Sequence, residues 1–175
     1  MAETAETAET AAGSTQPAAQ SQNSVAGKPL MEGDELLAHL PHRPPFLFVS
    51  RVTRMDDNGI TAEFDADPQM DFFNGHFPGN PITPGVILLE AAAQAGVIWM
   101  HHLLGERADG SKRLIFAASF DGVRFRRPVL PGETVTIECK IKSVRKRFSL
   151  TSFRISAADG SLCAEGTLGA AWKEP

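Results

Sequence analysis

The pattern of apolar and polar residues divides the chain after about residue 29. Residues 1–29 carry a threefold Ala-Glu-Thr repeat followed by Ala, Gly, Ser, Gln and Pro, with almost no large apolar side chains. Such a segment buries too little surface to offset the entropy lost on ordering it. We therefore predict a disordered tail over residues 1–29. Residues 30–175 have a length that suits one globular domain.

The longest apolar stretch follows a loop that is rich in proline and glycine. Residues 74–84 include three prolines and two glycines, which predicts a stiff, shaped loop. From Gly85 to about Leu104 the sequence is strongly helix-forming. We expect Thr83 to cap this helix and Pro84 to occupy its first position.

Two polar side chains interrupt the apolar surface of this predicted helix. Within residues 86–100 the strongly polar side chains are Glu90 and Gln94, and their spacing of four places them on one face. A helix that is apolar on nearly every side belongs inside a protein. The apolar run is shorter than a bilayer requires and contains a carboxylate, so we expect a buried helix and no membrane insertion.

Shorter runs on both sides of this helix have the composition of strands. A short helix is expected over residues 31–40, ending at Pro41. Strands are expected over residues 46–52 and 60–64, and then over about 113–125, 134–144, 148–157 and 161–172. In the run 148–157 the large apolar residues change faces, which predicts a bulge or a twist. The order of elements predicts an α+β fold in which a mainly antiparallel sheet wraps around one long central helix.

Composition and charge exclude several classes of function. The net charge of −4 is modest, which argues against nucleic-acid binding. Cys139 and Cys163 lie far apart without metal-ligand spacing, so we expect two buried free thiols and no metal. The acidic start lacks the apolar region of a secretory signal, and we expect a cytoplasmic protein.

Three motifs resemble those of one enzyme family. They are Leu-Pro-His-Arg-Pro-Pro-Phe-Leu-Phe-Val-Ser-Arg-Val from Leu40, Phe-Phe-Asn-Gly-His-Phe-Pro-Gly-Asn-Pro from Phe72, continuing into Pro-Gly-Val-Ile-Leu-Leu-Glu-Ala-Ala-Ala-Gln from Pro84, and Arg-Phe-Arg-Arg-Pro-Val-Leu-Pro-Gly-Glu from Arg124. They are similar to motifs of the FabZ-type beta-hydroxyacyl-acyl carrier protein dehydratases, over residues 31–172. The resemblance implies the hotdog fold, in which an antiparallel sheet wraps around a central helix.

The resemblance also implies a reaction and its residues. It implies dehydration of 3-hydroxyacyl thioesters to trans-2-enoyl thioesters in type II fatty acid biosynthesis, with His76 as the base and Glu90 as the acid. Histidine is readily available as a neutral base near pH 7, and a carboxyl group on an apolar helix face can hold a proton to donate. Unpaired N–H groups at the helix start, at Gly85 and Val86, would bind the thioester oxygen.

Further expectations concern the substrate and the assembly. The implied substrate tunnel includes Phe77, Gln94 and Phe116. The acyl chain would arrive on the phosphopantetheine arm of acyl carrier protein, without metal or redox cofactor. In this family the histidine and the glutamate of one site come from opposite subunits. That implies a homodimer or a trimer of dimers.

Some residues depart from the family pattern. The chain contains no tyrosine, although many members use one to gate the acyl tunnel, and Phe116 or Ile115 stands in its place. The related dehydratase-isomerases carry Asp as the acid, so Glu90 argues for dehydration without isomerisation. We expect His39 and His42 to serve packing or turn hydrogen bonds.

Basic residues gather in the second half of the chain. They allow two interpretations, solvated strand edges that deter edge pairing or a surface that docks the acidic carrier protein. The docking interpretation uses Arg124, Arg126, Arg127, Arg145, Lys146 and Arg147.

Two other functions stay open at this point. One is a hotdog thioesterase in which Glu90 activates water, which leaves His76 without a role. The other is a non-catalytic module that binds acyl carrier protein.

Overall fold

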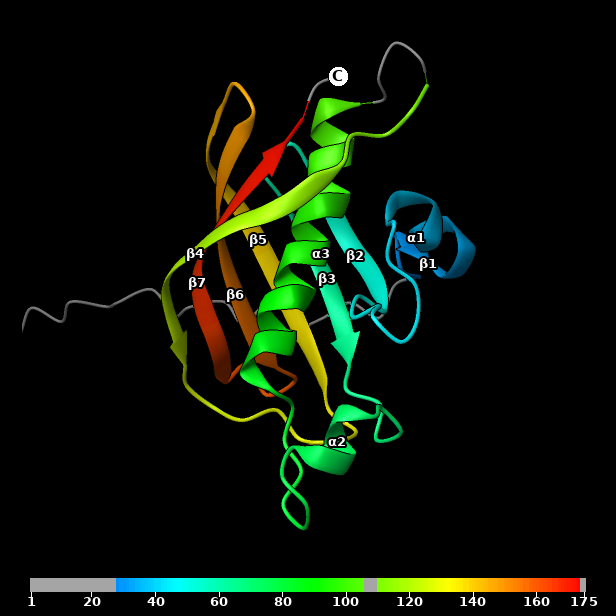
Figure 1. Ribbon diagram of the computed structural model, residues 1–175, viewed down its shortest axis with the longest axis vertical. Helices are drawn as coiled ribbons and strands as arrows, with labels where there is room; N and C mark the ends of the chain where they lie inside the picture. The colour runs from blue at the N-terminus through cyan, green and yellow to red at the C-terminus, as the bar shows by residue number, and fades with distance from the viewer. Residues whose placement is uncertain (1–27, 106–109, 174–175) are drawn as a thin grey trace, which may run out of the picture.

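One antiparallel sheet and one long helix form the core of the protein. The computed structural model describes residues 28–105 and 110–173. The sheet has the order β1-β2-β3-β5-β6-β7-β4, and α3 lies across one of its faces (Figure 1). The elements are β1 (Met31–Glu32), α1 (Gly33–His39), β2 (Arg51–Asp56), β3 (Gly59–Asp65), α2 (Phe72–Gly75), α3 (Gly85–Leu104), β4 (Ile115–Phe125), β5 (Thr134–Arg145), β6 (Phe148–Ala157) and β7 (Leu162–Trp172). The predicted α+β architecture is confirmed.

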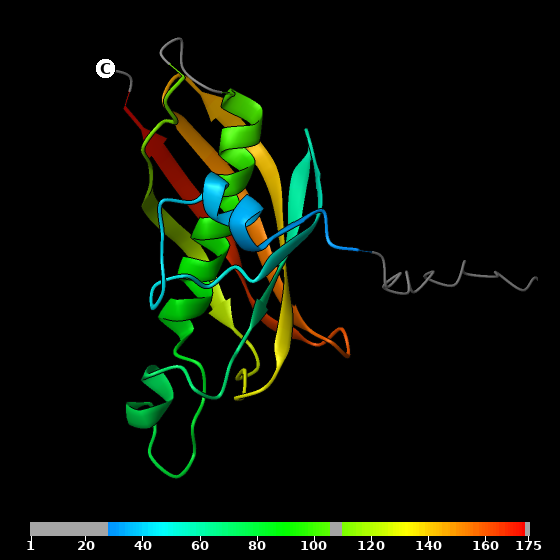
Figure 2. The ribbon, with the colours of Figure 1, turned by 90° about the vertical axis from the view of Figure 1, so that its right-hand side faces the viewer.

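Helix α3 is buried along most of its length. All ten residues from 91 to 100 are buried, and the helix packs against β3, β4, β5, β6 and β7. The sheet curves around it in the side view (Figure 2). By length and composition alone α3 could cross a membrane, but 67% of its most apolar window is buried inside the protein. The sheet therefore covers most of the apolar surface of α3.

The start of β2 differs from the sequence-based expectation. A strand was expected from residue 46, whereas β2 begins at Arg51. The backbone of Phe46 and Phe48 hydrogen-bonds the buried side chain of Gln94 instead of a neighbouring strand. A side-chain amide thus replaces the strand ladder over this segment.

The N-terminal region also differs in detail. Of the helix expected over residues 31–40, Gly33–His39 is helical, whereas Met31–Glu32 pairs with β2 as an edge strand. The prediction that Thr83 caps α3 is wrong. The residue before the helix is Pro84, which makes no side-chain cap. Thr83 instead donates its backbone N–H to the carbonyl of Val129, at 2.7 Å.

The predicted irregularity near residue 150 lies on the neighbouring strand. The register between β5 and β6 shifts between Ile141 and Ser143, and β6 itself alternates regularly. Ser149 and Thr151 are buried in the same alternation as Phe153 and Ile155. The core face of β6 therefore includes two hydroxyl side chains that a search for apolar residues does not detect.

Glycine at position 59 is required by close packing in the sheet. A Cβ atom at Gly59 would lie 2.2 Å from the backbone oxygen of Cys139 on β5. We predict that Gly59→Ala destabilises the protein by roughly 1–3 kcal/mol, because backbone atoms cannot move aside without breaking the ladder. Urea unfolding measures this difference.

The control for this prediction is Gly75→Ala, where a Cβ would meet nothing within 4 Å. Equal unfolding midpoints for the two variants would contradict the packing argument.

Candidate active site

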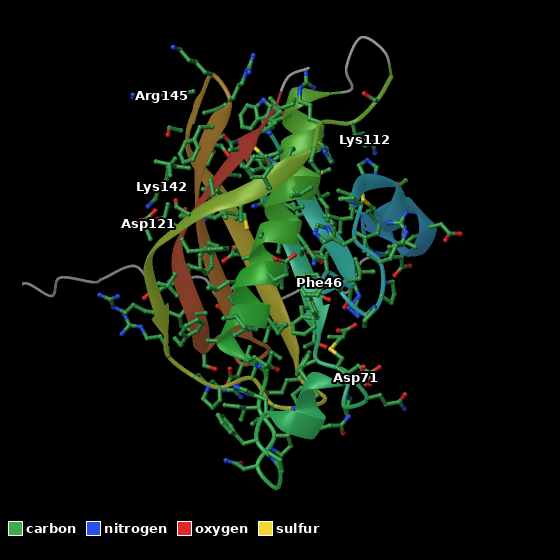
Figure 3. All side chains as sticks on the ribbon, viewed as in Figure 1. Phe46, Asp71, Lys112, Asp121, Lys142 and Arg145 are labelled. Atoms are coloured by element: carbon green, nitrogen blue, oxygen red, sulfur yellow. The ribbon has the colours of Figure 1, made fainter. Side chains whose placement is uncertain are left out.

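Glu90 faces a pocket between α3 and the start of β4. The pocket has a volume of about 320 Å³ and its other lining residues are mostly apolar; it is lined by Pro41, His42, Phe46, Glu90, Ala93, Gln94, Val97, Leu114, Ile115, Phe116 and Ala117. Phe46 lies beside the middle of α3 (Figure 3). The side chain of Glu90 is 26% exposed, so a small ligand in the pocket can reach a carboxyl group in otherwise apolar surroundings.

Gln94 holds the carboxyl group of Glu90 from the next turn of the helix. Its Nε2 donates to Oε1 of Glu90 at 3.0 Å and to the carbonyl of Phe46 at 3.1 Å. Its Oε1 accepts the N–H of Phe48 at 2.8 Å. Gln94 is completely buried. It therefore lines the pocket and also holds the carboxyl group of Glu90 in place.

His42 is a site residue that the sequence-based reasoning missed. Its Nε2 lies 3.5 Å from Oε1 of Glu90, although only a packing or turn role was expected for it. The available signal was the Pro-His-Arg-Pro-Pro run, which marks a rigid turn that aims its side chains in fixed directions.

The imidazole of His76 is held by the loop before α3. Its Nδ1 lies 3.0 Å from the carbonyl oxygen of Ile82, and its backbone carbonyl accepts the N–H of the same residue at 3.1 Å. A carbonyl oxygen can only accept, so Nδ1 is the donor, and in the neutral tautomer the lone pair lies on Nε2. In the neutral ring, Nε2 is therefore the nitrogen that can accept a proton.

The start of α3 forms a second pocket. Its volume is about 440 Å³, and its lining includes Gly85, Val86 and the ring of Phe125. A Cβ at Gly85 would lie 2.9 Å from that ring, so glycine allows the close approach here. The first N–H groups of a helix lack intrahelical acceptors and carry its positive dipole end, so they can bind an oxyanion.

Within one chain, the residues of the predicted site are divided between separate surfaces. Glu90 and Gln94 line the first pocket, whereas Gly85 and Val86 line the second. His76 is not among the lining residues of the Glu90 pocket. Phe77, which was expected in the tunnel, follows His76 in the loop and is 55% exposed.

The two candidates for the gating position differ in exposure. Both Ile115 and Phe116 line the Glu90 pocket. Ile115 is 5% exposed and belongs to the core, whereas Phe116 is 42% exposed. Phe116 is the one of the two with room to move.

The basic residues that were expected to dock a carrier protein do not form one patch. Arg126 and Arg127 line the pocket at the start of α3. Asp71 lies at the end of the molecule where α3 begins, and Arg145 lies at the opposite end of the sheet (Figure 3). Lys146 and Arg147 follow Arg145 in the hairpin before β6. Arg124 lies near the end of β4 and donates to the carbonyl of Val123.

Two of these arginines are already paired within the chain. Arg127 hydrogen-bonds Glu133, with Nη1 to Oε2 at 3.0 Å, and Arg126 pairs with Glu165 at 2.9 Å. The hydrogen bond from Arg127 lowers the pKa of Glu133, while the same contact raises the pKa of Arg127. Glu133 also accepts the N–H of Leu130, so this pair stabilises the turn beside the second pocket.

No metal site is evident in the described part of the chain. Residues 28–105 and 110–173 contain no group of three or more His, Cys, Asp or Glu side chains placed to hold a metal ion. Burial raises the pKa of the Cys139 thiol to about 12, which favours the neutral thiol.

Comparison with known proteins identifies a family and a fold. Residues 40–169 match the model of the FabA-like domain family. The 3-hydroxyacyl-(acyl-carrier-protein) dehydratase FabZ of Myxococcus xanthus is 41% identical over 138 residues, which cover 78% of this chain and 88% of that protein. The enzyme with the same name from Variovorax paradoxus is 42% identical over 142 residues, or 80% and 93% of the two chains.

Solved structures support the fold. A chain of the dehydratase heterocomplex ApeI:P from Xenorhabdus doucetiae superposes with a TM-score of 0.68 at 21% identity and covers 79% of this chain and 91% of that chain. The E. coli PaaI protein from the phenylacetic acid degradation operon gives a TM-score of 0.52 at 18% identity, over 69% and 80% of the two chains. These similarities confirm the hotdog fold.

The pair of Arg127 and Glu133 makes stability depend on pH. Because the pKa of Glu133 is lowered in the folded state, its stabilisation is complete above the unfolded-state value of about 4.3 and is lost as pH falls through the folded-state value. We predict that Glu133→Gln unfolds at lower urea concentration than the native protein at pH 7, and that this difference shrinks as pH falls below about 4.

The matched control is Glu165→Gln, which removes the more exposed pair with Arg126. Its effect at pH 7 should be smaller, because exposed ion pairs stabilise little. A difference for Glu133→Gln that stays constant between pH 7 and pH 3 would contradict the prediction.

Proposed function

The chain belongs to the FabZ-type 3-hydroxyacyl-acyl-carrier-protein dehydratases of the FabA-like domain family, and we propose that it removes water from 3-hydroxyacyl thioesters through His76 and Glu90. The product is a trans-2-enoyl thioester, and the reaction is a step of type II fatty acid biosynthesis. The observation that carries the proposed roles is the hydrogen bond from Nδ1 of His76 to Ile82, which leaves Nε2 free as a base.

The proposed reaction transfers two protons, one from the substrate to His76 and one from Glu90 to the departing hydroxyl group. Nε2 of His76 takes a proton from the carbon next to the thioester carbonyl, and the electron pair of that C–H bond forms the new double bond. Glu90 gives a proton to the hydroxyl group, which leaves as water with the electrons of its C–O bond. The apolar lining around Glu90 suits an acid that must keep its proton until this step.

The N–H groups at the start of α3 can bind the carbonyl oxygen of the thioester. As the α-proton leaves, negative charge develops on the carbonyl oxygen, and N–H groups already in place lower the energy of that state. Gly85 and Val86 supply the first N–H groups of the helix. The pocket beside them continues toward Arg126 and Arg127 on the surface.

An active site formed by two chains would explain why His76 is not found beside Glu90 within a single chain. His76 is not among the residues that line the Glu90 pocket in a single chain, and β4 forms one edge of the sheet. Exposed apolar side chains lie on that strand and at the start of α3, namely Val86, Phe116 and Phe125. In the proposed homodimer, which can assemble further into a trimer of dimers, His76 of one chain meets Glu90 of the other.

The substrate side of the proposal concerns an acidic carrier protein. Acyl carrier protein would deliver the acyl chain on its phosphopantetheine arm. The docking residues would be Arg126 and Arg127, which line the second pocket, and Arg124 near the end of β4. Arg145, Lys146 and Arg147 would contribute long-range attraction from the far end of the sheet. Phe77, Gln94 and Phe116 would border the acyl chain, with Phe116 as its gate. No metal or redox cofactor takes part in this scheme, and a cytoplasmic location fits it.

We predict that His76→Ala and Glu90→Gln each lower the rate of enoyl formation by roughly 10²–10⁴-fold, because each removes one proton-transfer group. The assay supplies a 3-hydroxyacyl carrier-protein thioester and records enoyl product and free acid separately. Free acid that persists in His76→Ala would instead indicate a thioesterase. Carrier-protein binding without either product would indicate a non-catalytic module.

We also predict that the two inactive variants complement each other. A heterodimer of one His76→Ala chain and one Glu90→Gln chain holds one intact site of two, so its turnover should be about half that of the native dimer. Dual affinity tags isolate this heterodimer after coexpression. Heterodimers as inactive as either homodimer would place both residues of a site on one chain.

A further inference from the structure

The imidazole of His42 faces the carboxyl group of Glu90. Its Nε2 lies 3.5 Å from Oε1 of Glu90, and a shift of roughly half an ångström would make this contact a hydrogen bond. Both side chains line the same pocket, and they are the two titratable groups among its lining residues. His42 is therefore the lining residue of this pocket that can place a positive charge beside Glu90.

A rigid turn sets the position of His42. The Nη1 of Arg43 donates to the carbonyl oxygens of Leu40 and His42, each at 2.7 Å. The N–H of Phe46 closes the turn on the carbonyl of Arg43 at 2.8 Å. The Phe46 ring stacks on the imidazole, with centroids 6.5 Å apart and planes inclined by 30°. Hydrogen bonds to the backbone of the turn and the ring of Phe46 thus fix the position of the imidazole.

The surroundings of His42 select one tautomer. Its Nδ1 is buried and has no hydrogen-bond partner among the described residues. A buried N–H without an acceptor is rarer in proteins than an under-used acceptor. The proton of the neutral ring therefore belongs on Nε2, the nitrogen that faces Oε1 of Glu90.

Gln94 directs a second N–H to the same oxygen. Its own Oε1 accepts the N–H of Phe48, which fixes the orientation of the amide and leaves Nε2 to donate to Oε1 of Glu90. Oε1 thus accepts one N–H at 3.0 Å and has a second nitrogen 3.5 Å away. The proton of a neutral Glu90 carboxyl group must then sit on the other oxygen, Oε2.

We propose that His42 is a positioning residue that, together with Gln94, holds Oε1 of Glu90 and leaves Oε2 to carry the acid proton. This inference rests on the proposed function. When Oε2 gives its proton to the departing hydroxyl group, the C–O bond breaks and water leaves. Glu90 remains as a carboxylate whose charge the N–H groups of His42 and Gln94 stabilise. His42 acts through its contact with the carboxyl group of Glu90.

The test compares two substitutions at the same position. His42→Phe keeps a ring on Phe46 but removes the donor, and it should lower kcat by roughly tenfold to a hundredfold with KM nearly unchanged. His42→Gln restores a side-chain N–H toward Oε1 and should recover much of that loss. If His42→Phe does not fold, as judged by thermal unfolding, the kcat of His42→Gln is compared with that of His42→Leu.

Two controls separate this role from a structural one. His39→Gln changes a nearby histidine whose Nδ1 contacts the carbonyl of Glu35, and it should keep native kcat. In a Glu90→Gln background, measured by single turnover, His42→Phe should cause no further loss, because its effect passes through the carboxyl group. Native kcat in His42→Phe, or an undiminished loss in the Glu90→Gln background, would overturn the proposal.

A further measurement does not depend on turnover. Glu90→Gln should shift the ¹⁵N resonances of the His42 ring and leave those of His39 in place. If the native protein forms no enoyl product, the proposed function fails while this measurement still tests the contact. Unmoved His42 resonances would remove the basis of the inference, whatever the activity.

Discussion

The side-chain amide of Gln94 joins the central helix to the segment that covers it, and the geometry of the candidate site depends on this junction. The amide is completely buried, and its hydrogen bonds reach Phe46, Phe48 and Glu90. Leaving one such buried group unpaired costs about 1–3 kcal/mol. The position of the Glu90 carboxyl group, the path of residues 46–48 and the turn that carries His42 are therefore set together.

The general architecture could be predicted because it follows from local patterns. An apolar run after a proline-rich loop specifies α3, and turn dipeptides such as Asp159-Gly160 specify hairpins, as observed between β6 and β7. The start of β2 could not be predicted in this way. Residues 46–48 have the composition of a strand, but Phe48 pairs with a side chain 46 residues away in sequence, and tertiary contacts of this kind override local propensity.

The candidate site, too, could be predicted from the sequence only in part. The motifs in the loop and in α3 made His76 and Glu90 candidates through their resemblance to one family, and a carboxylate on an apolar helix is unusual in itself. The contact between His42 and Glu90 joins residues that are 48 positions apart, and the pair of Arg127 and Glu133 depends on a particular turn. Neither follows from spacing alone, since each depends on how separate segments pack.

The burial of α3 also has a consequence for the synthesis of the chain on the ribosome. The helix ends at Leu104, but β4, β5, β6 and β7, which cover much of its surface, follow it in the chain and end only at Trp172. At roughly 5–20 residues per second a ribosome needs several seconds to add them. During that interval the newly made chain exposes a helix that is apolar enough to cross a membrane. The nascent chain is therefore a natural client for chaperones until its last strand has emerged.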